Sequence, residues 1–179
     1  MTQAFTSTQT FERLIGAMEE KRLSATEAKP GDEYSLGGGT FRILGPISLS
    51  DSNMNNNSIV IRLEYKGVSF LFTGDAERQE ENNILDFCSE NRFPLSASVI
   101  KLGHHGSDTS STKNFLAAAS PSIGMITCGA GNVYGHPNAK ALERCADAGI
   151  AVYRSDLNGN VIVYSDGRTV WVDVEREGE

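Results

Sequence analysis

The chain has 179 residues, 39% of them hydrophobic, which suits one globular domain with a real core but is short for two. No run reaches the roughly 18 apolar residues that a membrane span requires, and no basic-then-apolar signal opens the chain, so we expect it to be soluble as given. The formal net charge of −7 argues against a generally basic surface that wraps nucleic acid, although a metal site can hold a single phosphodiester through its own ions.

The N-terminal half is predicted to contain one helix followed by several short strands. Thr10 can cap the helix, whose apolar residues share one face and are expected to pack on the rest of the protein. Glycine-rich turns precede a strand expected at residues 40–44. After a polar loop at 48–57, alternating apolar residues predict two strands joined by a tight turn between 58 and 72.

The C-terminal half alternates between strand and helix patterns. Helices are expected at 76–87, 111–119 and 138–148, and strands at 97–102, 123–127, 152–153, 161–164 and 169–174. Such alternation predicts a layered α/β architecture with the site residues on loops beyond the strand ends. We therefore interpret residues 1–179 as a single α/β domain.

The three cysteines give no indication of a disulfide framework. Cys88, Cys128 and Cys145 are widely spaced and odd in number, which also argues against a cysteine-rich zinc site. Because free cysteine is commonly buried, we expect all of them to be buried thiols.

All three histidines follow predicted strands, in loops flanked by glycine. They are His104, His105 and His136, and Asp75 occupies a matching position after an earlier strand. A structural role is the simpler interpretation for any one of them, but the shared placement favours a site. Imidazole and carboxylate are the ligands of a hydrolytic zinc centre. We expect Asp75 and the histidine pair to converge at one sheet edge with His136 close by, and the glycines beside the pair to provide its sharp turn.

Five ordered blocks carry a resemblance to a known family. They are NNNSIVIRL at 55–63, FLFTGDAE at 70–77, VIKLGHHGSDTSS at 99–111, NVYGHP at 132–137 and YRSDLNG at 153–159. Their order and spacing resemble the metallo-β-lactamase-like domain of ComEC-type DNA-uptake proteins, over about residues 8 to 172. The resemblance implies an αββα sandwich, of which this chain would be the C-terminal portion.

The resemblance also implies roles for the clustered residues. Asp75 would bridge a pair of zinc ions, with manganese as the alternative metal, and one of His104 and His105 would supply the last metal-binding histidine. We favour His105 as the ligand and His104, with His136, as the catalytic partner that faces the phosphate or stabilises the leaving oxygen. Ser107 would face the same phosphate.

Two further positions are implied to contact substrate. Asn57 and Ser58 fall where many relatives place another metal histidine, and ComEC-type members also have an Asn-x-Ser motif there. We therefore expect both residues, together with Ser107 and His136, to bind substrate.

The family's His-x-His-x-Asp-His loop, which provides most of the ligands, does not occur in this sequence. Zinc takes about four ligands, so we expect a truncated, split or incomplete domain that is metal-free and inactive by itself. The absent N-terminal segment would be its natural partner. Without that segment, apolar surface and a strand edge should be exposed, and we expect self-association.

Three functions are compatible with these residues. The first is a metal-dependent phosphodiesterase or nuclease that acts on DNA or a related phosphodiester. The second is a non-catalytic binding or assembly module with the same fold. The third is a β-lactam or thioester hydrolase, because a fold alone does not name a substrate. The residues do not distinguish the bacterial cytoplasm from the extracytoplasmic face of a membrane protein.

One segment matches a calcium-binding motif only in part. Asp51-x-Asn53-x-Asn55 copies the opening of a calcium-binding loop, but Asn56 and Arg62 stand where the motif requires Gly and Glu. We therefore do not expect calcium to bind there.

Overall fold

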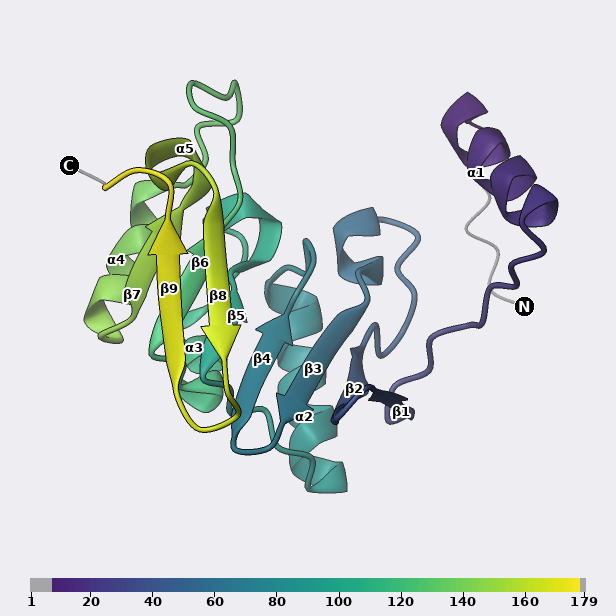
Figure 1. Ribbon diagram of the computed structural model, residues 1–179, viewed down its shortest axis with the longest axis horizontal. Coiled ribbons are helices and arrows are strands. Elements are labelled where there is room, and N and C mark those ends of the chain that lie inside the picture. The colour runs from purple at the N-terminus through teal and green to yellow at the C-terminus, as the bar shows by residue number, and fades with distance from the viewer. Residues whose placement is uncertain (1–7, 178–179) are drawn as a thin grey trace.

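A mixed sheet of seven strands forms the centre of the computed structural model, which describes residues 8–177 (Figure 1). The strands lie side by side in chain order, as β1 (Glu33–Leu36), β2 (Gly39–Gly45), β3 (Val60–Tyr65), β4 (Val68–Phe72), β5 (Val99–Lys101), β6 (Ile123–Ile126) and β7 (Ala151–Arg154). Pairing is antiparallel from β1 to β4 and parallel from β4 to β7.

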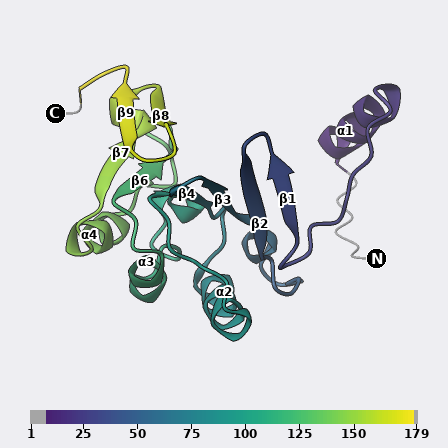
Figure 2. The same cartoon turned by 60° about the horizontal axis from the view of Figure 1, so that its bottom comes forward.

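Helices cover one face of this sheet. Each parallel connection crosses over through a helix, namely α2 (Arg78–Asn91), α3 (Lys113–Ala119) and α4 (Ala139–Asp147). Figure 2 shows these helices together below the sheet, with the β8 (Val161–Ser165) and β9 (Val170–Val174) hairpin on the opposite side. Short helical turns form at η1 (Met54–Asn57), η2 (Gly103–Gly106) and α5 (Ser155–Asn158). The predicted alternating α/β class is confirmed.

The core lies between the sheet and the three helices. Leu71 and Ile100 from the sheet meet Ile84 and Phe115 from the helices, and all four are fully buried. Cys88 and Cys145 join this core, where burial raises the pKa of each thiol to about 11. Cys128 is only partly buried, so the expectation of buried thiols holds for two of the three.

The first helix differs from its prediction. α1 (Gln9–Glu20) begins earlier than expected, because the Thr8 hydroxyl accepts a hydrogen bond from the Phe11 N–H at 3.2 Å. Thr8, and not Thr10, is therefore the cap. The helix also stands apart from the sheet (Figure 1), and its apolar Leu14 is 56% exposed. The expectation that α1 packs by its apolar face is wrong, since periodicity defines such a face but not its partner.

Within residues 8–177, no helix combines the length and the apolar character needed to cross a bilayer.

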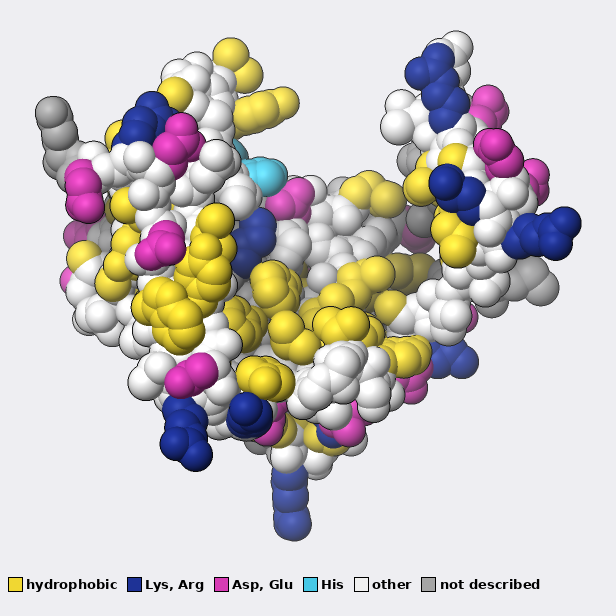
Figure 3. Space-filling model, in the orientation of Figure 1, with side chains coloured by type: hydrophobic (Ala, Val, Ile, Leu, Met, Phe, Trp, Pro, Cys, Tyr) yellow, Lys and Arg dark blue, Asp and Glu magenta, His cyan; other side chains and the backbone are white. Residues whose placement is uncertain are grey.

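Apolar side chains are exposed on the sheet face opposite the helices. Figure 3 shows them gathered between the β8–β9 hairpin and the N-terminal strands. Phe72 on β4 is 41% exposed and Trp171 on β9 is 47% exposed. Phe70, Phe72, Met125 and Val163 line a shallow groove on this face. Contiguous apolar surface of this kind commonly mediates association.

We therefore expect self-association of the isolated chain, measurable as a rise in sedimentation coefficient across a concentration series. Phe72→Ser should weaken it, because it removes an apolar ring from the exposed face. Val133→Ser should not, since Val133 is exposed on a loop outside the sheet. A concentration-independent monomer would contradict the prediction.

A buried carboxylate fixes the segment that leads into α3. Glu81 on α2 is 1% exposed and accepts hydrogen bonds from the backbone N–H groups of Ser111 and Thr112. Burial raises the pKa of Glu81, and these hydrogen bonds only partly oppose that rise. From α4, Arg144 donates to the Ser110 and Ser111 carbonyls at 2.7 and 2.8 Å. Two helices therefore hold this segment from opposite sides.

Glu81→Ala should lower the free energy of unfolding by about 3 kcal/mol, because it leaves buried backbone donors without an acceptor. Urea denaturation monitored by circular dichroism would measure the loss. Glu90→Ala, an exposed change on the same helix, should alter stability by no more than about 0.5 kcal/mol. Equal effects of the two substitutions would show that the Glu81 contacts contribute little.

Candidate functional site

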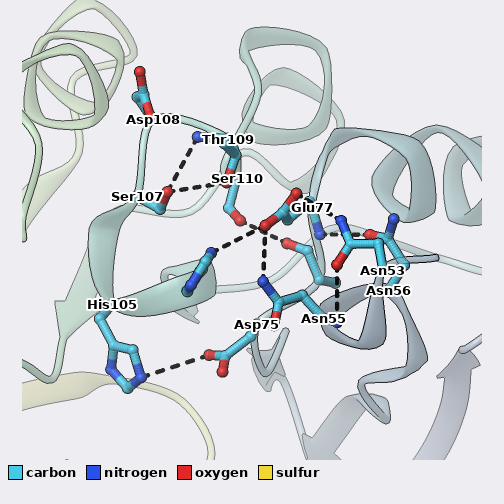
Figure 4. Close-up of polar contacts among 12 residues, drawn as sticks. Asn53, Asn55, Asn56, Asp75, Glu77, His105, Ser107, Asp108, Thr109 and Ser110 are labelled. Carbon is cyan, nitrogen blue, oxygen red and sulfur yellow. Dashed lines mark hydrogen bonds and ion pairs between the residues drawn. The ribbon is translucent and has the colours of Figure 1, made fainter. Parts of the chain in front are cut away.

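The site lies at the carboxyl ends of two parallel neighbours, β4 and β5. Asp75 follows β4, and the η2 turn with His104 and His105 follows β5. The His104 N–H donates to the Gly74 carbonyl at 3.0 Å and ties the two loops together. The His105 Nε2 lies 3.7 Å from Asp75 Oδ1 (Figure 4). The structure thus brings Asp75 and the histidine pair together at one sheet edge, as the strand-end pattern predicted.

The histidine pair has an uncommon backbone. His104 and His105 have positive φ angles of 48° and 55°, in the left-handed region where residues with a Cβ are disfavoured. We expected the flanking glycines to make this turn, but the histidines make much of it themselves. Gly106, at φ 81°, continues the turn, and a Cβ there would lie 2.7 Å from the Pro137 Cβ. Left-handed residues of this kind concentrate at functional sites.

The orientation of His105 is fixed by a backbone carbonyl. Its Nδ1 lies 2.6 Å from the Thr127 carbonyl oxygen, which can only accept, so Nδ1 carries the proton. In the neutral ring, Nε2 then has a free lone pair on the side of Asp75. A carbonyl behind one ring nitrogen is the usual support of a metal-binding histidine. This geometry favours His105 over His104 as the ligand.

His104 and His136 form the second part of the cluster. Their ring centroids are 5.4 Å apart, and the Nδ1 atom of each is buried without a hydrogen-bond partner among residues 8–177. His104 Nδ1 is 3.3 Å from Glu77 Oε1, within ion-pair distance but without hydrogen-bond alignment. Burial lowers the pKa of His136, and the neighbouring His104 and His105 lower it further. His136 is therefore predominantly neutral at neutral pH.

Glu77, which the sequence analysis did not single out, organises the polar side of the site (Figure 4). The side-chain nitrogens of Asn53 and Asn55 donate to its carboxylate at 2.9 and 2.8 Å. Burial alone would raise the pKa of Glu77, but hydrogen bonds from Asn55, Asn53 and Thr109 outweigh it and lower the pKa. Asn53 and Asn55 belong to the calcium-like motif. Their side-chain nitrogens donate to the Glu77 carboxylate.

The three residues expected to bind substrate beside the histidines have local partners. The Ser58 hydroxyl accepts from the Asp75 N–H at 2.9 Å and so positions the loop that carries the carboxylate. Asn57 exchanges hydrogen bonds with the backbone of Ser50 at 2.7 and 3.0 Å. Ser107 is buried, with its hydroxyl 2.9 Å from that of Thr109. Substrate contact by these three residues remains a prediction.

The clustered side chains provide some of the donors that the expected metal needs. Asp75 and the His105 Nε2 offer the carboxylate oxygen and imidazole nitrogen that zinc accepts. Within residues 8–177, however, no three His, Cys, Asp or Glu side chains gather closely enough to hold an ion. The residues therefore fit part of a zinc site, well short of about four ligands.

No family model matches the chain. It is 32% identical over 160 residues to ComE operon protein 3 of Bacillus subtilis, an alignment covering 89% of this chain and 20% of that protein. By sequence, the chain is similar to proteins named for competence. Competence protein ComA of Neisseria gonorrhoeae is 35% identical over 119 residues, which cover 66% of this chain and 17% of ComA. Recombination protein 2 of Haemophilus influenzae is 30% identical over 133 residues, which cover 74% of this chain and 16% of that protein. The chain thus spans about a fifth or less of the length of these relatives.

The tautomer of His105 can be measured directly. Because the Thr127 carbonyl accepts the Nδ1 proton, a long-range ¹H–¹⁵N spectrum of the neutral ring should show His105 as the Nδ1–H form. Thr127 contributes this contact through its backbone, so a Thr127→Ser variant should leave the tautomer unchanged and serve as the control. An Nε2–H signal for His105 would contradict the assignment of Nε2 as the ligand atom.

Proposed function

We propose that this chain carries part of a metal-dependent phosphodiesterase site that acts on DNA, on a metallo-β-lactamase-like αββα scaffold. The observation that carries the proposal is the pairing of Asp75 with a His105 whose Nδ1 is occupied by a backbone carbonyl. This leaves Nε2 and a carboxylate oxygen on the same side, as a catalytic metal requires.

The relatives support the DNA-related part of the proposal. Proteins named for competence and recombination fit a role with DNA, although their names do not state a reaction. Charge adds a constraint, because a chain of net charge −7 holds a phosphodiester best where a cation offsets the repulsion. The cation site is therefore where we place the substrate.

The roles of the chain's own groups follow from their positions. A bound zinc or manganese ion would polarise the phosphate and lower the pKa of a water molecule. Asp75 and His105 would hold the ion, and Ser58 and the Thr127 carbonyl would orient these two ligands. His136 lies beside His104 at the same edge and would face the phosphate or the leaving oxygen.

The remaining ligands require another segment of polypeptide. Two donors cannot fix the geometry of a catalytic zinc ion, which needs about three protein ligands and an open position. We propose that a segment with further histidines packs on the exposed apolar face of the sheet and completes the αββα layering. The apolar groove beside β4 lies on that face.

A non-catalytic module is the second candidate. The small number of clustered donors within residues 8–177 favours it, since a domain that only binds or assembles needs no complete metal site. The two candidates differ in what happens when further metal ligands are supplied.

The isolated chain should hydrolyse neither single-stranded DNA nor a generic phosphodiester above background, with zinc or manganese present, because no three donor side chains cluster within residues 8–177. Fused to the His-x-His-x-Asp-His segment of a ComEC-type domain, it should acquire activity. Asp75→Asn should then reduce turnover by at least about 100-fold, since the metal loses a ligand. Release of labelled nucleotides would be the assay.

Asp173→Asn on β9 is the matched control and should leave turnover unchanged. Activity of the isolated chain that is lost in Asp75→Asn would show that no further ligands are needed. A folded fusion that binds zinc through Asp75 yet remains inactive would favour the non-catalytic module.

A further inference from the structure

A polar cavity lies next to Glu77, where the 53–56 turn, the start of α2 and the 108–109 loop meet. Its volume is about 610 Å³. Side-chain amides dominate its lining, and we call it the carboxamide pocket after Asn53, Asn56, Gln79, Asn82 and Asn83. A volume in the range of about 300–1,000 Å³ is typical of small-ligand sites.

Several amides in the pocket have unused hydrogen-bonding capacity. Asn56 is 4% exposed, and its Oδ1 accepts from the Glu77 N–H at 3.0 Å, which leaves its side-chain NH₂ with no partner among residues 8–177. Asn83 donates to Glu80 at 3.0 Å and keeps its Oδ1 as an acceptor. Gln79 and Asn82 make no side-chain hydrogen bond within the described residues. Amides that line a cavity and have free donors and acceptors can bind a polar ligand.

The charges around the pocket argue against an anionic ligand. The carboxylates of Glu77 and Asp108 line it with the single guanidinium of Arg78. An anionic phosphate would be repelled by this balance. The pocket suits a neutral group that both donates and accepts hydrogen bonds.

We propose that the carboxamide pocket binds a purine base of a single-stranded nucleic-acid substrate. Carboxamides pair in a bidentate manner with the N6 and N7 edge of adenine, and arginine pairs with O6 and N7 of guanine. A base reaches such a pocket only when it is unpaired. The position of the attached phosphate, at Asp75 and His105, rests on the proposed function, whereas recognition of the base needs neither metal nor turnover.

Glu77 links the pocket to the candidate metal site. Its carboxylate lines the pocket and lies 3.3 Å from His104 Nδ1, while Asp75 stands two residues earlier on the same loop. A nucleic-acid strand whose base enters the pocket is thereby directed towards the sheet edge that carries Asp75 and His105. The pocket would select the nucleotide next to the reacting phosphate.

The test uses deoxynucleosides as probes, because they carry a base and no phosphate. Titration of the isotope-labelled chain with deoxyadenosine or deoxyguanosine should shift the side-chain amide signals of Asn56 and Asn83 saturably. Deoxycytidine and thymidine should bind at least about 5-fold more weakly, since they lack the N7 acceptor. Maltose, a neutral polyol, should produce no saturable shift.

The Gln79→Ala/Asn82→Ala double variant should weaken deoxyadenosine binding by about 5-fold or more, through loss of hydrogen bonds. Both positions are exposed on α2, so the fold should be retained. Asn91→Ala on the same helix, outside the pocket, is the control.

Absence of nucleoside shifts, equal shifts with maltose, or stronger binding of pyrimidines would overturn the pocket proposal and leave the proposed phosphodiesterase function untouched. Conversely, purine binding retained in an Asp75→Asn fusion that binds metal normally would refute the metal assignment alone.

Discussion

The parallel pairing of β4 with β5 is the interaction on which the rest of the site depends. It brings two loops that are far apart in sequence to one edge, where the His104 N–H binds the Gly74 carbonyl. Asp75 and His105 face each other only because of this register. A slip of one residue would turn the inward side chains of a strand to the opposite face of the sheet. Burial of Leu71 and Ile100 against the helices therefore also protects the register on which the site depends.

The loops at this edge are held by groups that do not belong to the candidate metal site. Glu81 and Arg144 fix the segment after the histidine turn. Glu77 fixes the turn at residues 53–56 through its hydrogen bond from Asn53. Such support offsets the left-handed backbone of the histidine pair, which costs about 1–2 kcal/mol per residue. Preorganisation of this kind would hold His105 in place before the proposed metal ion binds.

The structure presents a site that is well oriented but sparse in donors. The sheet face beside this site exposes apolar side chains, among them Phe72 and Trp171. The carboxamide pocket adds a different kind of recognition beside it, neutral and amide-rich. Division of labour between a cation for phosphate and amides for a base would give a nucleic-acid enzyme both affinity and selectivity.

The sequence by itself determined the alternation of strands and helices and the gathering of Asp75 with the histidines, because parallel strands end at a common edge. Periodicity could not reveal that α1 stands alone, since an apolar face does not name its partner. Nor could it choose between His104 and His105. What distinguishes the two rings is the Thr127 carbonyl beside His105 Nδ1, a contact across 22 residues that only the folded chain creates. Glu77 escaped notice for the same reason, because its amide partners lie on a loop more than 20 residues away that only tertiary packing brings within hydrogen-bond reach.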